Sequence, residues 1–543
     1  MGDTLPEPKP QAKPFFVVGD KHEFDPERWT APGNGYAGEE ALPPPKRDPE
    51  THVKVLIVGA GYAGLMAALE CWRKGHDVVG ILERSEGPNF SGDLIIIQPS
   101  AMNIMRHWPQ MRRELEHDKV TVGTYYHRHD GELIDGPVDP NFNAPEHVAA
   151  RESQPGGFPY VGAVQIRQKF YRMLLRQVAR LGFTVDYGKR VENYFEDEAA
   201  GLAGVVLTDG SIRTAHLVVA ADGSRSRSEL LIAGNYAPVR SSGMTVYRTA
   251  FPAALAFADE QVRARWEGKH TYEFWMGSGM HIGLYFSDDM VAFGITPRDT
   301  FLAPDKVARE SWDPNVDPQE VVDVLRRARV SGVDGESDWH PVIEAFVRTA
   351  PRGSLIHWPL LWRDLRRDWI SKGGRVVQIG DAAHSTVPAS AAGGTLALED
   401  AITLASCLQL AASPGCPTWS GAGAGVPMGT RVYNLLRYER ASCTQKMAFV
   451  NSQALGHTTD WDAVRRNPEK VHLRYPRWLF LHDPESYVYE KYGRAFAHLV
   501  AGAEFRNTNI PPGHKFVHWT LEQIQKEMAA GKRVEDLLDG DWT

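Results

Sequence analysis

The sequence predicts a mixed α/β fold, and three observations carry that prediction. A β-branched run at residues 53–58 leads through a glycine-rich turn into a helix with an apolar face at residues 65–73. The pattern becomes β-rich between residues 240 and 300. A buried strand at residues 375–379 is then followed by a helix at residues 395–410. We therefore expect an α/β domain interleaved with a β-sheet domain, and a helical region at the C-terminus.

Length and composition limit the class of protein. The chain has 543 residues, which is more than one hydrophobic core usually organises. Its formal net charge of -8 and pI near 6.2 argue against electrostatic binding of nucleic acid. Four scattered cysteines without a CxxC pair favour a reducing compartment. We recognise no signal peptide and no membrane span, and so expect a cytoplasmic protein.

The chain divides by pattern into an arm, two interleaved domains and a helical tail. Residues 1–50 are rich in Pro, Gly and charge, which indicates an extended arm with little core of its own. Helical periodicity appears at residues 166–181 and again at residues 318–350. We expect the α/β domain at residues 51–130, 160–238 and 370–410, the β-sheet domain at residues 131–159 and 239–369, a flexible loop at residues 411–430 and a helical region at residues 431–543.

The glycine-rich turn reads GAGYAG and joins the first strand to its helix. Gly59 permits the tight turn, Gly61 allows close approach to a pyrophosphate, and Gly64 lets helix and strand pack closely. Glu83 ends the next strand, where its carboxylate would accept hydrogen bonds from an adenosine ribose. The motif predicts a Rossmann-like domain and by itself leaves FAD and NAD open. The cofactor-binding residues expected here are Gly59, Gly61, Ala63, Gly64, Glu83 and Arg84.

A second motif, GDAAH at residues 380–384, follows the buried strand near the end of the α/β domain. Asp381 stands directly after the strand, where a carboxylate can bind ribityl hydroxyls. Gly393 and Gly394 open a helix whose N-terminal N–H groups and dipole favour the electron-rich ring of a reduced flavin. The residues expected to bind cofactor in this part of the chain are Gly380, Asp381, Pro388, Gly393, Gly394 and Thr395.

A third motif, VVAADGSRS at residues 218–226, lies between the other two. Together the motifs resemble the three fingerprints of class A FAD-dependent monooxygenases, the aromatic hydroxylases of the 4-hydroxybenzoate and salicylate hydroxylase type. The match runs from about residue 53 to residue 401. The Pro-rich arm and the long C-terminal extension resemble members from fungal secondary metabolism. The resemblance implies that the α/β domain binds FAD and that the β-sheet domain holds the substrate.

The resemblance also implies particular contacts with the cofactors. Glu83 would bind the adenosine ribose, Arg167 would reach the phosphate and ribityl region, and Asp381 would hold the ribityl chain and diphosphate. Pro388 would lie beside the isoalloxazine, and Asp222 would belong to the segment that serves both FAD and NAD(P)H. By pattern alone, Arg167 is also consistent with a surface arginine on an amphipathic helix, and Asp222 with an Asp-Gly turn.

Three positions depart from the pattern of the family. Glu229 stands where arginine is usual, Ala391 where glycine is usual, and Thr395 where asparagine is usual. We therefore expect the binding of NAD(P)H, the movement of the flavin and the contacts with its pyrimidine edge to differ from those of the better known members.

The β-rich region offers two candidate catalytic residues, Arg248 and Tyr285. In the hydroxylases of phenolic polyketides that this region resembles, an arginine and a tyrosine at such positions contact the substrate. The resemblance implies that Arg248 stabilises a phenolate and that Tyr285 orients the same oxygen. A cross-strand ion pair for Arg248 and a core position for Tyr285 are the alternatives. His281 is expected to be a structural hydrogen-bonding residue.

We expect no metal site. His127 and His129 alternate along a strand that ends in Asp-Gly, which indicates a hairpin, and no third ligand follows nearby. His384 is expected to pack at its turn and not to act as a triad base, because no G-x-S-x-G elbow accompanies it.

The family resemblance implies a monooxygenase that uses NADPH or NADH and O2 to insert one oxygen atom into an aromatic or polycyclic hydrophobic substrate. Reduced FAD would form a C4a-hydroperoxide, with hydroxylation of a phenol as the leading outcome. Epoxidation, dearomatising oxidation and Baeyer–Villiger-type insertion use the same intermediate and stay open, as do a flavin-dependent reductase or halogenase on the same fold. We expect a monomer or homodimer, with no nucleic-acid partner.

Overall fold

The computed structural model describes residues 42–90, 92–153, 160–303, 316–332, 335–418, 420–456 and 460–543. The mixed α/β fold expected from the sequence is confirmed. Of the arm expected at residues 1–50, only residues 42–50 are described. They form no helix or strand, and the backbone N–H of Asp48 donates to the carbonyl of Arg73 at 2.7 Å. This part of the arm is therefore attached to the end of a helix of the α/β domain.

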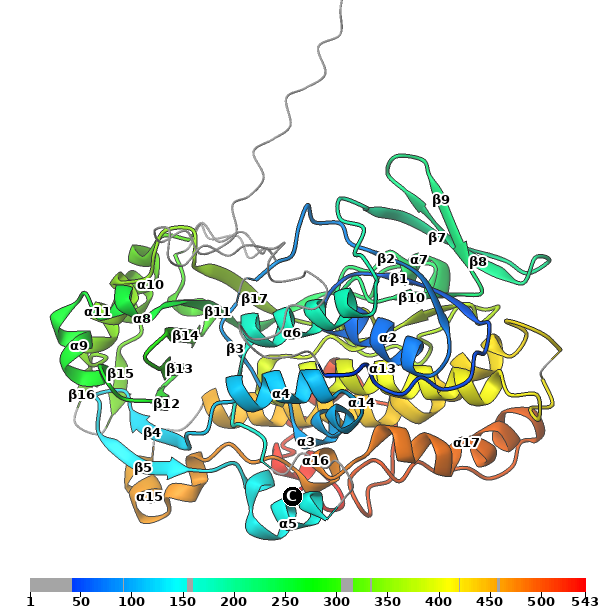
Figure 1. Cartoon of the computed structure of the whole chain (residues 1–543). Coiled ribbons are helices and arrows are strands. Elements are labelled where there is room, and N and C mark those ends of the chain that lie inside the picture. The colour runs from blue at the N-terminus through cyan, green and yellow to red at the C-terminus, as the bar shows by residue number, and fades with distance from the viewer. Residues whose placement is uncertain are drawn as a thin grey trace, which may run out of the picture.

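A parallel sheet of four strands forms the centre of the α/β domain (Figure 1). Its strands are short apolar runs, as expected for a parallel sheet that is covered on both faces. Neighbouring residues of one strand show the two sides: Ile57 packs among helices, and Leu56 and Val58 pack against a second sheet. In spatial order the strands are β18 (Val376–Gln378), β10 (Leu217–Ala220), β1 (Lys54–Val58) and β2 (Asp77–Leu82).

Helices cover one face of the parallel sheet, and a three-stranded antiparallel sheet covers the other. The helical layer consists of α2 (Tyr62–Arg73) and α13 (Gly393–Ala411), and α6 (Arg167–Arg180) packs on α2. The antiparallel sheet consists of β7 (Val191–Asp197), β8 (Leu202–Leu207) and β9 (Ile212–Ala215). Both α2 and α13 begin at the carboxyl edge of the parallel sheet, where ligands bind in open α/β sheets.

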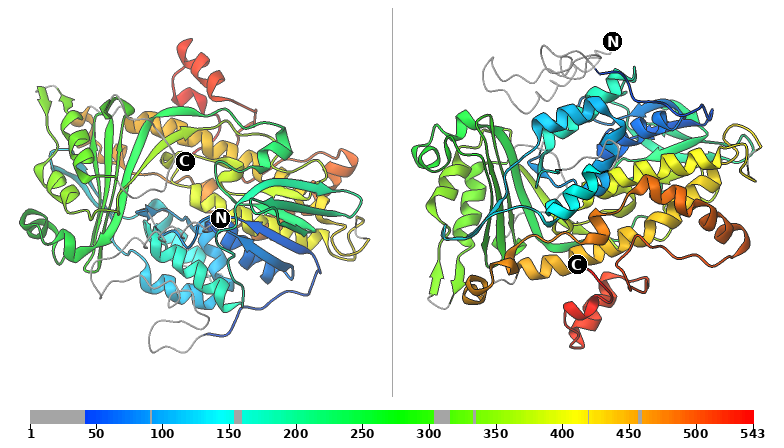
Figure 2. Two further views of the ribbon diagram at one scale, coloured as in Figure 1. Left: turned by 90° about the horizontal axis from the view of Figure 1, so that it is seen from above. Right: turned by 60° about the horizontal axis from the view of Figure 1, so that its bottom comes forward.

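A sheet of seven strands forms the second domain, beside the first (Figure 2). One of its faces carries large apolar residues such as Tyr247, Trp275 and Phe293, which pack against a layer of helices. The other face is turned towards the α/β domain. The strands are, in spatial order, β17 (Ile356–Trp362), β11 (Arg240–Pro252), β14 (Met290–Pro297), β13 (Met280–Phe286), β12 (Thr271–Gly277), β4 (Thr124–Arg128) and β5 (Leu133–Val138). The covering helices are α8 (Ala253–Ala256), α9 (Glu260–Trp266), α10 (Pro318–Arg327) and α11 (Pro341–Arg348).

The C-terminal region is helical and packs along α13. Helix α14 (Val426–Gly456) lies beside α13, and α17 (Pro484–Ala501) contacts both of them (Figure 1). The other helices of this region are α15 (Trp461–Arg466), α16 (Arg477–Phe480) and α18 (Leu521–Ala529). The remaining elements are α3 (Pro99–Met102), α4 (Pro109–Asp118), α5 (Pro145–Glu152), α7 (Ser228–Ala233), α12 (Asp381–His384), the strand pairs β3 (Leu94–Ile95) with β6 (Gln165–Ile166) and β15 (Val330–Gly332) with β16 (Gly335–Ser337), and the 3-10 helices η1 (Asn103–His107), η2 (Asn141–Asn143), η3 (Asp299–Phe301), η4 (Pro388–Ser390), η5 (Pro468–Val471) and η6 (Glu535–Leu537).

Two elements differ from the ranges expected from the sequence. Strand β4 lies within residues 51–130, expected for the α/β domain, yet it pairs in parallel with β12 of the seven-stranded sheet. It forms a hairpin with β5, as its Asp-Gly turn predicts, so the two strands stay together. Helix α14 begins at Val426, inside the segment expected as a loop at residues 411–430. Pro427 fits there because proline is tolerated in the first turn of a helix.

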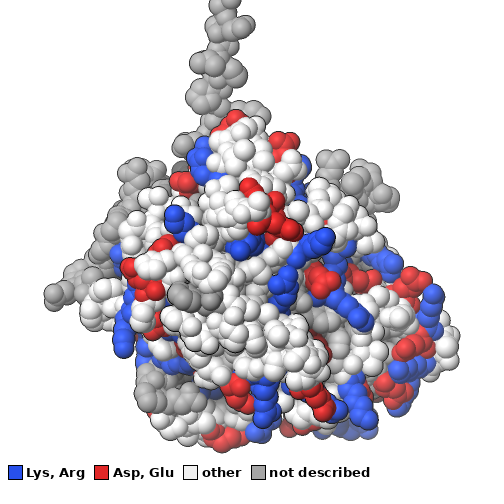
Figure 3. Space-filling view, turned by 90° about the vertical axis from the view of Figure 1, so that its right-hand side faces the viewer, with Lys and Arg blue, Asp and Glu red and all other residues white. Residues whose placement is uncertain are grey.

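The surface shows no large region of one charge in the view of Figure 3, where basic and acidic side chains alternate. Within the described ranges, no helix is both long enough and apolar enough to cross a membrane. The same part of the chain contains no group of three or more His, Cys, Asp or Glu side chains that could hold a metal ion. His127 instead stacks on Trp275 at 4.9 Å between ring centroids.

Candidate active site

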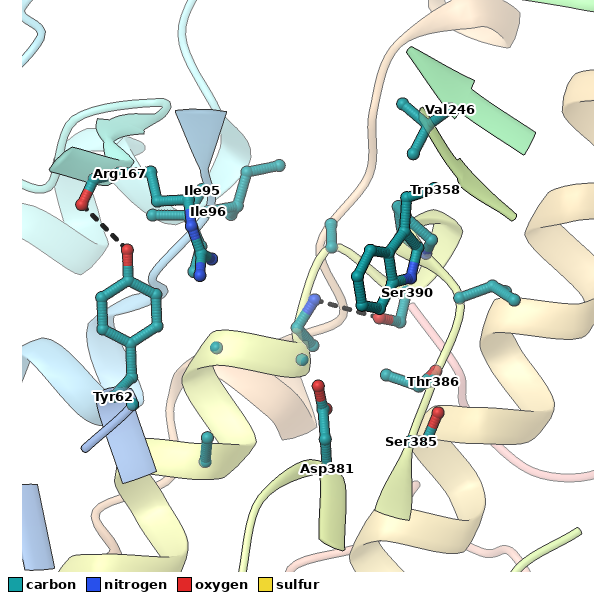
Figure 4. Close-up of a pocket in the computed structure, with 18 of the residues that line it drawn as sticks. Tyr62, Ile95, Ile96, Arg167, Val246, Trp358, Asp381, Ser385, Thr386 and Ser390 are labelled. Atoms are coloured by element: carbon teal, nitrogen blue, oxygen red, sulfur yellow. Dashed lines mark hydrogen bonds between the residues drawn. The ribbon is translucent and has the colours of Figure 1, made fainter. Parts of the chain in front are cut away.

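A cavity of about 1310 Å³ lies between the parallel sheet and the seven-stranded sheet. It begins at the glycine-rich turn, passes Asp381, and ends against the seven-stranded sheet. Figure 4 shows its middle part, with Ile95 and Ile96 on one side and Trp358 on the other. The candidate residues that line it are Gly59, Gly61, Ala63, Glu83, Arg84, Arg167, Asp222, Arg248, Asp381, Pro388, Gly393 and Gly394. Most of the residues selected from the sequence are thus brought together in one space.

The glycine-rich turn forms the first end of the cavity. Gly59 has φ of +102°, and a Cβ there would lie 2.3 Å from the carbonyl oxygen of Ala221. A Cβ on Gly61 would meet nothing within 4 Å, so the turn is open towards the cavity. Gly64 does not line the cavity. A Cβ there would lie 1.9 Å from the carbonyl oxygen of Gly59, so this glycine permits close packing of helix and strand.

Two acidic residues lie near this end. Glu83, directly after β2, accepts hydrogen bonds from the backbone N–H groups of Ala60 and Ser85, both at 2.9 Å. Asp222 follows β10 and accepts a hydrogen bond from the hydroxyl of Tyr194 at 2.8 Å. Burial raises the pKa of Asp222, and hydrogen bonds from Ser226 and Tyr194 oppose that effect.

Arg167 lies at the start of α6, across the cavity from Asp381. Its guanidinium carbon is 4.9 Å from the centre of the Tyr62 ring, and the Tyr62 hydroxyl donates to the Arg167 carbonyl at 2.9 Å (Figure 4). A Cβ on Gly92 would lie 2.4 Å from Cδ of Arg167, so the glycine leaves room for this side chain. Arg167 is therefore a cavity residue, and the alternative of a surface arginine is excluded.

A buried network of charged residues on α13 and α14 holds the GDAAH segment in place. Asp400 of α13 accepts hydrogen bonds from the backbone N–H of Gly380 at 2.8 Å and from the ring of His384. Arg437 of α14 donates to Asp400 at 2.8 Å and to Glu399 at 2.6 Å. Although burial disfavours its charge, Asp400 keeps a lowered pKa because His384 and Arg437 surround it. His384 is thus buried in a structural contact at its turn, and Gly380 does not line the cavity.

The segment from Pro388 to Gly394 leads into α13 and forms the central wall. Ala391 adopts φ of +50°, in the left-handed region that favours glycine. A Cβ on Gly394 would lie 2.6 Å from the side chain of Ile95. Thr395 does not line the cavity. Its hydroxyl accepts a hydrogen bond from the backbone N–H of Gln98 at 3.0 Å, so it joins α13 to the segment before α3.

The seven-stranded sheet closes the far end with two rows of residues on its cavity face. Paired residues on neighbouring strands project from the same face, so the register defines the rows. The first row is Arg248, Gly294, Gly283 and Phe274, and the second is Val246, Thr296, His281 and Met276. Gly283 leaves the floor open, because a Cβ there would meet nothing within 4 Å, and Gly294 leaves room for the side chain of Asp93.

Arg248 is the charged residue of this floor. Its guanidinium lies 3.9 Å from the carboxylate of Asp93, on the segment between β2 and β3. Burial lowers the pKa of Arg248, and the nearby Asp93 opposes that effect. Burial also raises the pKa of Asp93. A Cβ on Gly294 would lie 2.6 Å from Oδ2 of Asp93, so the carboxylate rests directly against the sheet.

Tyr285 is not brought to the cavity, which corrects the role expected for it. It lies one row beyond Arg248, paired with Tyr272 and Ala292. That row is covered by Val164 and Ile166, with which Tyr285 forms a buried cluster. The alternative given for Tyr285, a core position, agrees with this placement.

His281 lines the cavity, although a structural role was expected for it. Its side chain lines the cavity, and no hydrogen bond or ion pair to it exists within the described residues. It is therefore not the structural hydrogen-bonding residue expected from the sequence.

Several cavity residues could not be singled out from the sequence. Asp93 lies outside the three motifs, and its position opposite Arg248 depends on folding of two distant segments. Trp358 of β17 lies beside Val246 of β11. Residues 469–475 come from the C-terminal region and reach the cavity from the side of β12.

The residues present fit FAD. Helices α2 and α13 both point an N-terminus at the cavity, and in neither does a side chain cap the first turn. Free N–H groups at these two helix ends suit a pyrophosphate and the pyrimidine edge of a flavin. The open turn at Gly61 leaves space for the pyrophosphate, and the segment at Gly393 leaves space for the pyrimidine edge.

Comparisons with known proteins agree with this geometry. Residues 52–354 and 357–413 match the family described as FAD binding domain. The chain is 73% identical to the FAD-dependent monooxygenase nsrK of Aspergillus novofumigatus, covering 97% of this chain and 98% of that protein. The solved structure of CtdE with FAD and a substrate has a TM-score of 0.69 at 23% identity, over 82% of this chain and 100% of the other. Salicylate hydroxylase in a substrate complex has a TM-score of 0.58 at 19% identity, over 80% and 97%.

A cavity that joins a dinucleotide turn to an uncapped helix, beside a second sheet, is typical of a flavoprotein with two domains. The chain belongs to the FAD-binding-domain family. It is an FAD-dependent monooxygenase, and the resemblance to fungal enzymes of this kind is confirmed, while salicylate hydroxylase shares its fold.

Proposed function

We propose that this monooxygenase uses NAD(P)H and O2 to hydroxylate a phenol that lies on the floor of the cavity with its oxygen at Arg248. The observation that carries the proposal is the position of Arg248. It is a largely buried cation on the cavity face of the sheet, in the same row as Gly283, where a Cβ would meet no atom within 4 Å and a flat ring has room. A buried cation selects an anionic partner, and a phenolate is the aromatic anion that oxygen insertion requires.

In this proposal FAD occupies the length of the cavity. Glu83 binds the adenosine ribose, and the N–H groups at Gly61 receive the pyrophosphate. Asp381 binds the ribityl hydroxyls, and Gly393 and Gly394 contact the pyrimidine edge. When bound, FAD would accept two electrons from NAD(P)H and use them to activate O2.

Arg248 acts on the substrate directly. Its guanidinium stabilises the phenolate, so the proton of the phenol is lost more readily and the ring becomes a better nucleophile. Asp93 is a positioning residue. Its carboxylate, 3.9 Å away, holds the guanidinium over the sheet, and its raised pKa weakens the competition for the cation.

Apolar side chains exclude water from the reacting ring. Val246 and Trp358 cover one side of the floor and Phe274 the other. Exclusion of water strengthens the interaction of Arg248 with a phenolate, and it protects the activated oxygen from reaction with water. Leu473, from the C-terminal region, belongs to the same lining.

Glu229 does not oppose NAD(P)H at the cavity. It stands where the family usually has arginine, but it lies outside the cavity lining and accepts a hydrogen bond from the backbone of Ala237 at 3.3 Å. Arg366 lies 3.5 Å from its carboxylate. We therefore infer that Asp222 and its neighbours on the cavity, not position 229, contact the nicotinamide dinucleotide.

The test is a comparison of Arg248→Gln with Arg240→Gln. Arg240 lies on the same strand, is exposed, and does not line the cavity, which makes it a matched control. We expect Arg248→Gln to keep FAD but to form oxygenated product about 100-fold more slowly, with hydrogen peroxide released instead. The measurement is product and peroxide formed per NAD(P)H oxidised, with simple phenols and naphthols as substrates. Unchanged coupling in Arg248→Gln would reject the proposal.

A further inference from the structure

The second row of the cavity floor contains a polar group that the proposed reaction does not use. His281 lies in this row, on β13, and no described residue offers its ring a hydrogen bond or an ion pair. The residue is partly exposed and lines the cavity, and the few polar groups that line a cavity fix the orientation of a bound ligand.

The surroundings of His281 define what it can bind. Thr296 is its cross-strand partner on one side and Met276 on the other, and the ring of Phe274 stacks against it at 5.3 Å. No carboxylate or cation is among these neighbours. Burial alone lowers the pKa of His281 to about 4, so the ring is neutral near pH 7. A neutral imidazole has one donor and one acceptor nitrogen, which suits a hydroxyl or a carbonyl and not an anion.

The distance between the two rows sets the size of the ligand. Arg248 and His281 lie on strands separated by β14. Their rows are neighbours on the cavity face, so they differ by two residues along the strand direction. Two strand spacings amount to about 10 Å, and two residues along a strand to about 7 Å. The side chain of Arg248 shortens this span. A phenol with a single oxygen is too short to contact both residues, whereas a ligand with an oxygen at each end, on one ring or on two fused rings, is long enough.

We propose that His281 is a second substrate-binding residue, and that the substrate is a phenol with a second oxygen at the end remote from Arg248. The oxygen belongs to a hydroxyl or a carbonyl and is bound by the ring of His281, with the hydroxyl of Thr296 beside it. This inference deepens the proposed function, on which it rests for the oxygen at Arg248. It assigns the selection of substrates to the second row and the activation of the ring to the first.

The test measures binding to the FAD-loaded enzyme without NAD(P)H, so that no reaction occurs. The two probes are 2-naphthol and 2,6-dihydroxynaphthalene, which differ only in the distal hydroxyl, and the signal is the change in flavin absorbance. We expect the dihydroxy compound to bind about tenfold more tightly to the native enzyme, as one hydrogen bond to a buried group predicts. In His281→Phe the two probes should bind equally, and His281→Asn should restore part of the difference.

The control is His270→Phe, on the same domain, where the exposed histidine lies 3.2 Å from the carboxylate of Asp288 and does not line the cavity. It should leave the preference for the dihydroxy probe unchanged. Equal affinity of the native enzyme for both probes, or binding of neither, would overturn the inference. Failure of the proposed function is a separate result: a preference that depends on His281 without any oxygenated naphthol on addition of NAD(P)H and O2 would leave the second contact intact and remove the hydroxylation.

Discussion

At the scale of single residues, Ala391 stores strain beside the flavin site. It has φ of +50° and ψ of 25°, and it follows the short helix η4 in the wall of the cavity. The left-handed conformation costs a residue with a side chain roughly 1–2 kcal/mol. The hydrogen bond from the side chain of Gln98 to the Ala391 carbonyl, at 3.0 Å, helps to hold it there. Ala391, in place of the usual glycine, thus adds a side chain while the backbone keeps the left-handed conformation.

We expect Ala391→Gly to increase stability. Glycine removes the strain but loses about 0.4–1 kcal/mol through the greater freedom of its unfolded chain, so the net gain should be about 0.5–1 kcal/mol. The measurement is the free energy of unfolding of the FAD-loaded enzyme in urea. Ala389→Gly is the matched control, because Ala389 lies in the same segment and is not among the described residues with positive φ. It should lower stability, and a gain of similar size in both variants would exclude strain at Ala391 as the cause.

At the scale of elements, the seven-stranded sheet separates its two tasks by alternation. One face carries Tyr247, Trp275 and Ile282 into the core under α9 to α11. The other face carries the two rows of the cavity. Glycine is unfavourable inside strands, yet Gly283 and Gly294 are paired with each other in the centre of this sheet. Gly283 leaves the floor open where the proposed substrate ring would lie, and Gly294 leaves room for the carboxylate of Asp93, so we attribute both glycines to function.

Gly283→Val tests this assignment. A Cβ at Gly283 would meet no atom within 4 Å, and valine suits a strand, so the variant should fold and bind FAD normally. Its side chain would occupy the floor, and we expect KM for a naphthol substrate to rise at least about tenfold, through loss of more than 1 kcal/mol of ring contact. The measurements are flavin content, melting temperature and KM. A normal KM together with normal flavin content would show that the ring does not lie over this position.

The motifs were predictable from the sequence because their residues act through local backbone geometry. Gly59 and Gly61 form a turn within one strand–helix unit, and Asp381 follows its strand directly. The pairing of Arg248 with Asp93, in contrast, joins segments of two domains. The role of Tyr285 was expected from the family resemblance, but its exclusion from the cavity depends on the segment that covers its row. Contacts that depend on the packing of distant segments could therefore not be predicted from local sequence patterns.

At the scale of the whole molecule, buried charges connect the C-terminal region to the flavin site. Arg440 of α14 forms hydrogen bonds with Glu399 at 2.8 Å and with the carbonyl of Leu479, also at 2.8 Å. Burial disfavours ionisation of Glu399, but Arg440 and Arg437 keep its pKa well below the usual value. Breaking such a buried pair costs about 3–5 kcal/mol, because the remaining charge has no partner. The helices outside the matched family segment are therefore part of the same folded unit as the GDAAH segment.

Acid should destabilise this unit before its carboxylates are protonated, and His76 provides the test. His76 is fully buried, with its ring contacting the Ala405 carbonyl at 3.0 Å and the Thr51 hydroxyl at 2.6 Å. Burial lowers its pKa to about 4, from 6.5 in the unfolded chain. The unfolded state thus binds more protons between these values, and stability falls as the pH decreases from about 6.5 towards 4.

The loss attributable to His76 between pH 7 and pH 5 is about 2 kcal/mol, and His76→Gln should remove it. Glutamine keeps a donor for the Ala405 carbonyl and does not titrate. Asp93 and Asp222, whose pKa values burial raises, act in the opposite direction in both proteins, so the difference between the two pH profiles isolates the histidine. The measurement is the free energy of unfolding in urea at pH 7 and pH 5. Parallel profiles for the native chain and the variant would show that His76 accepts its proton equally well in the folded and unfolded states.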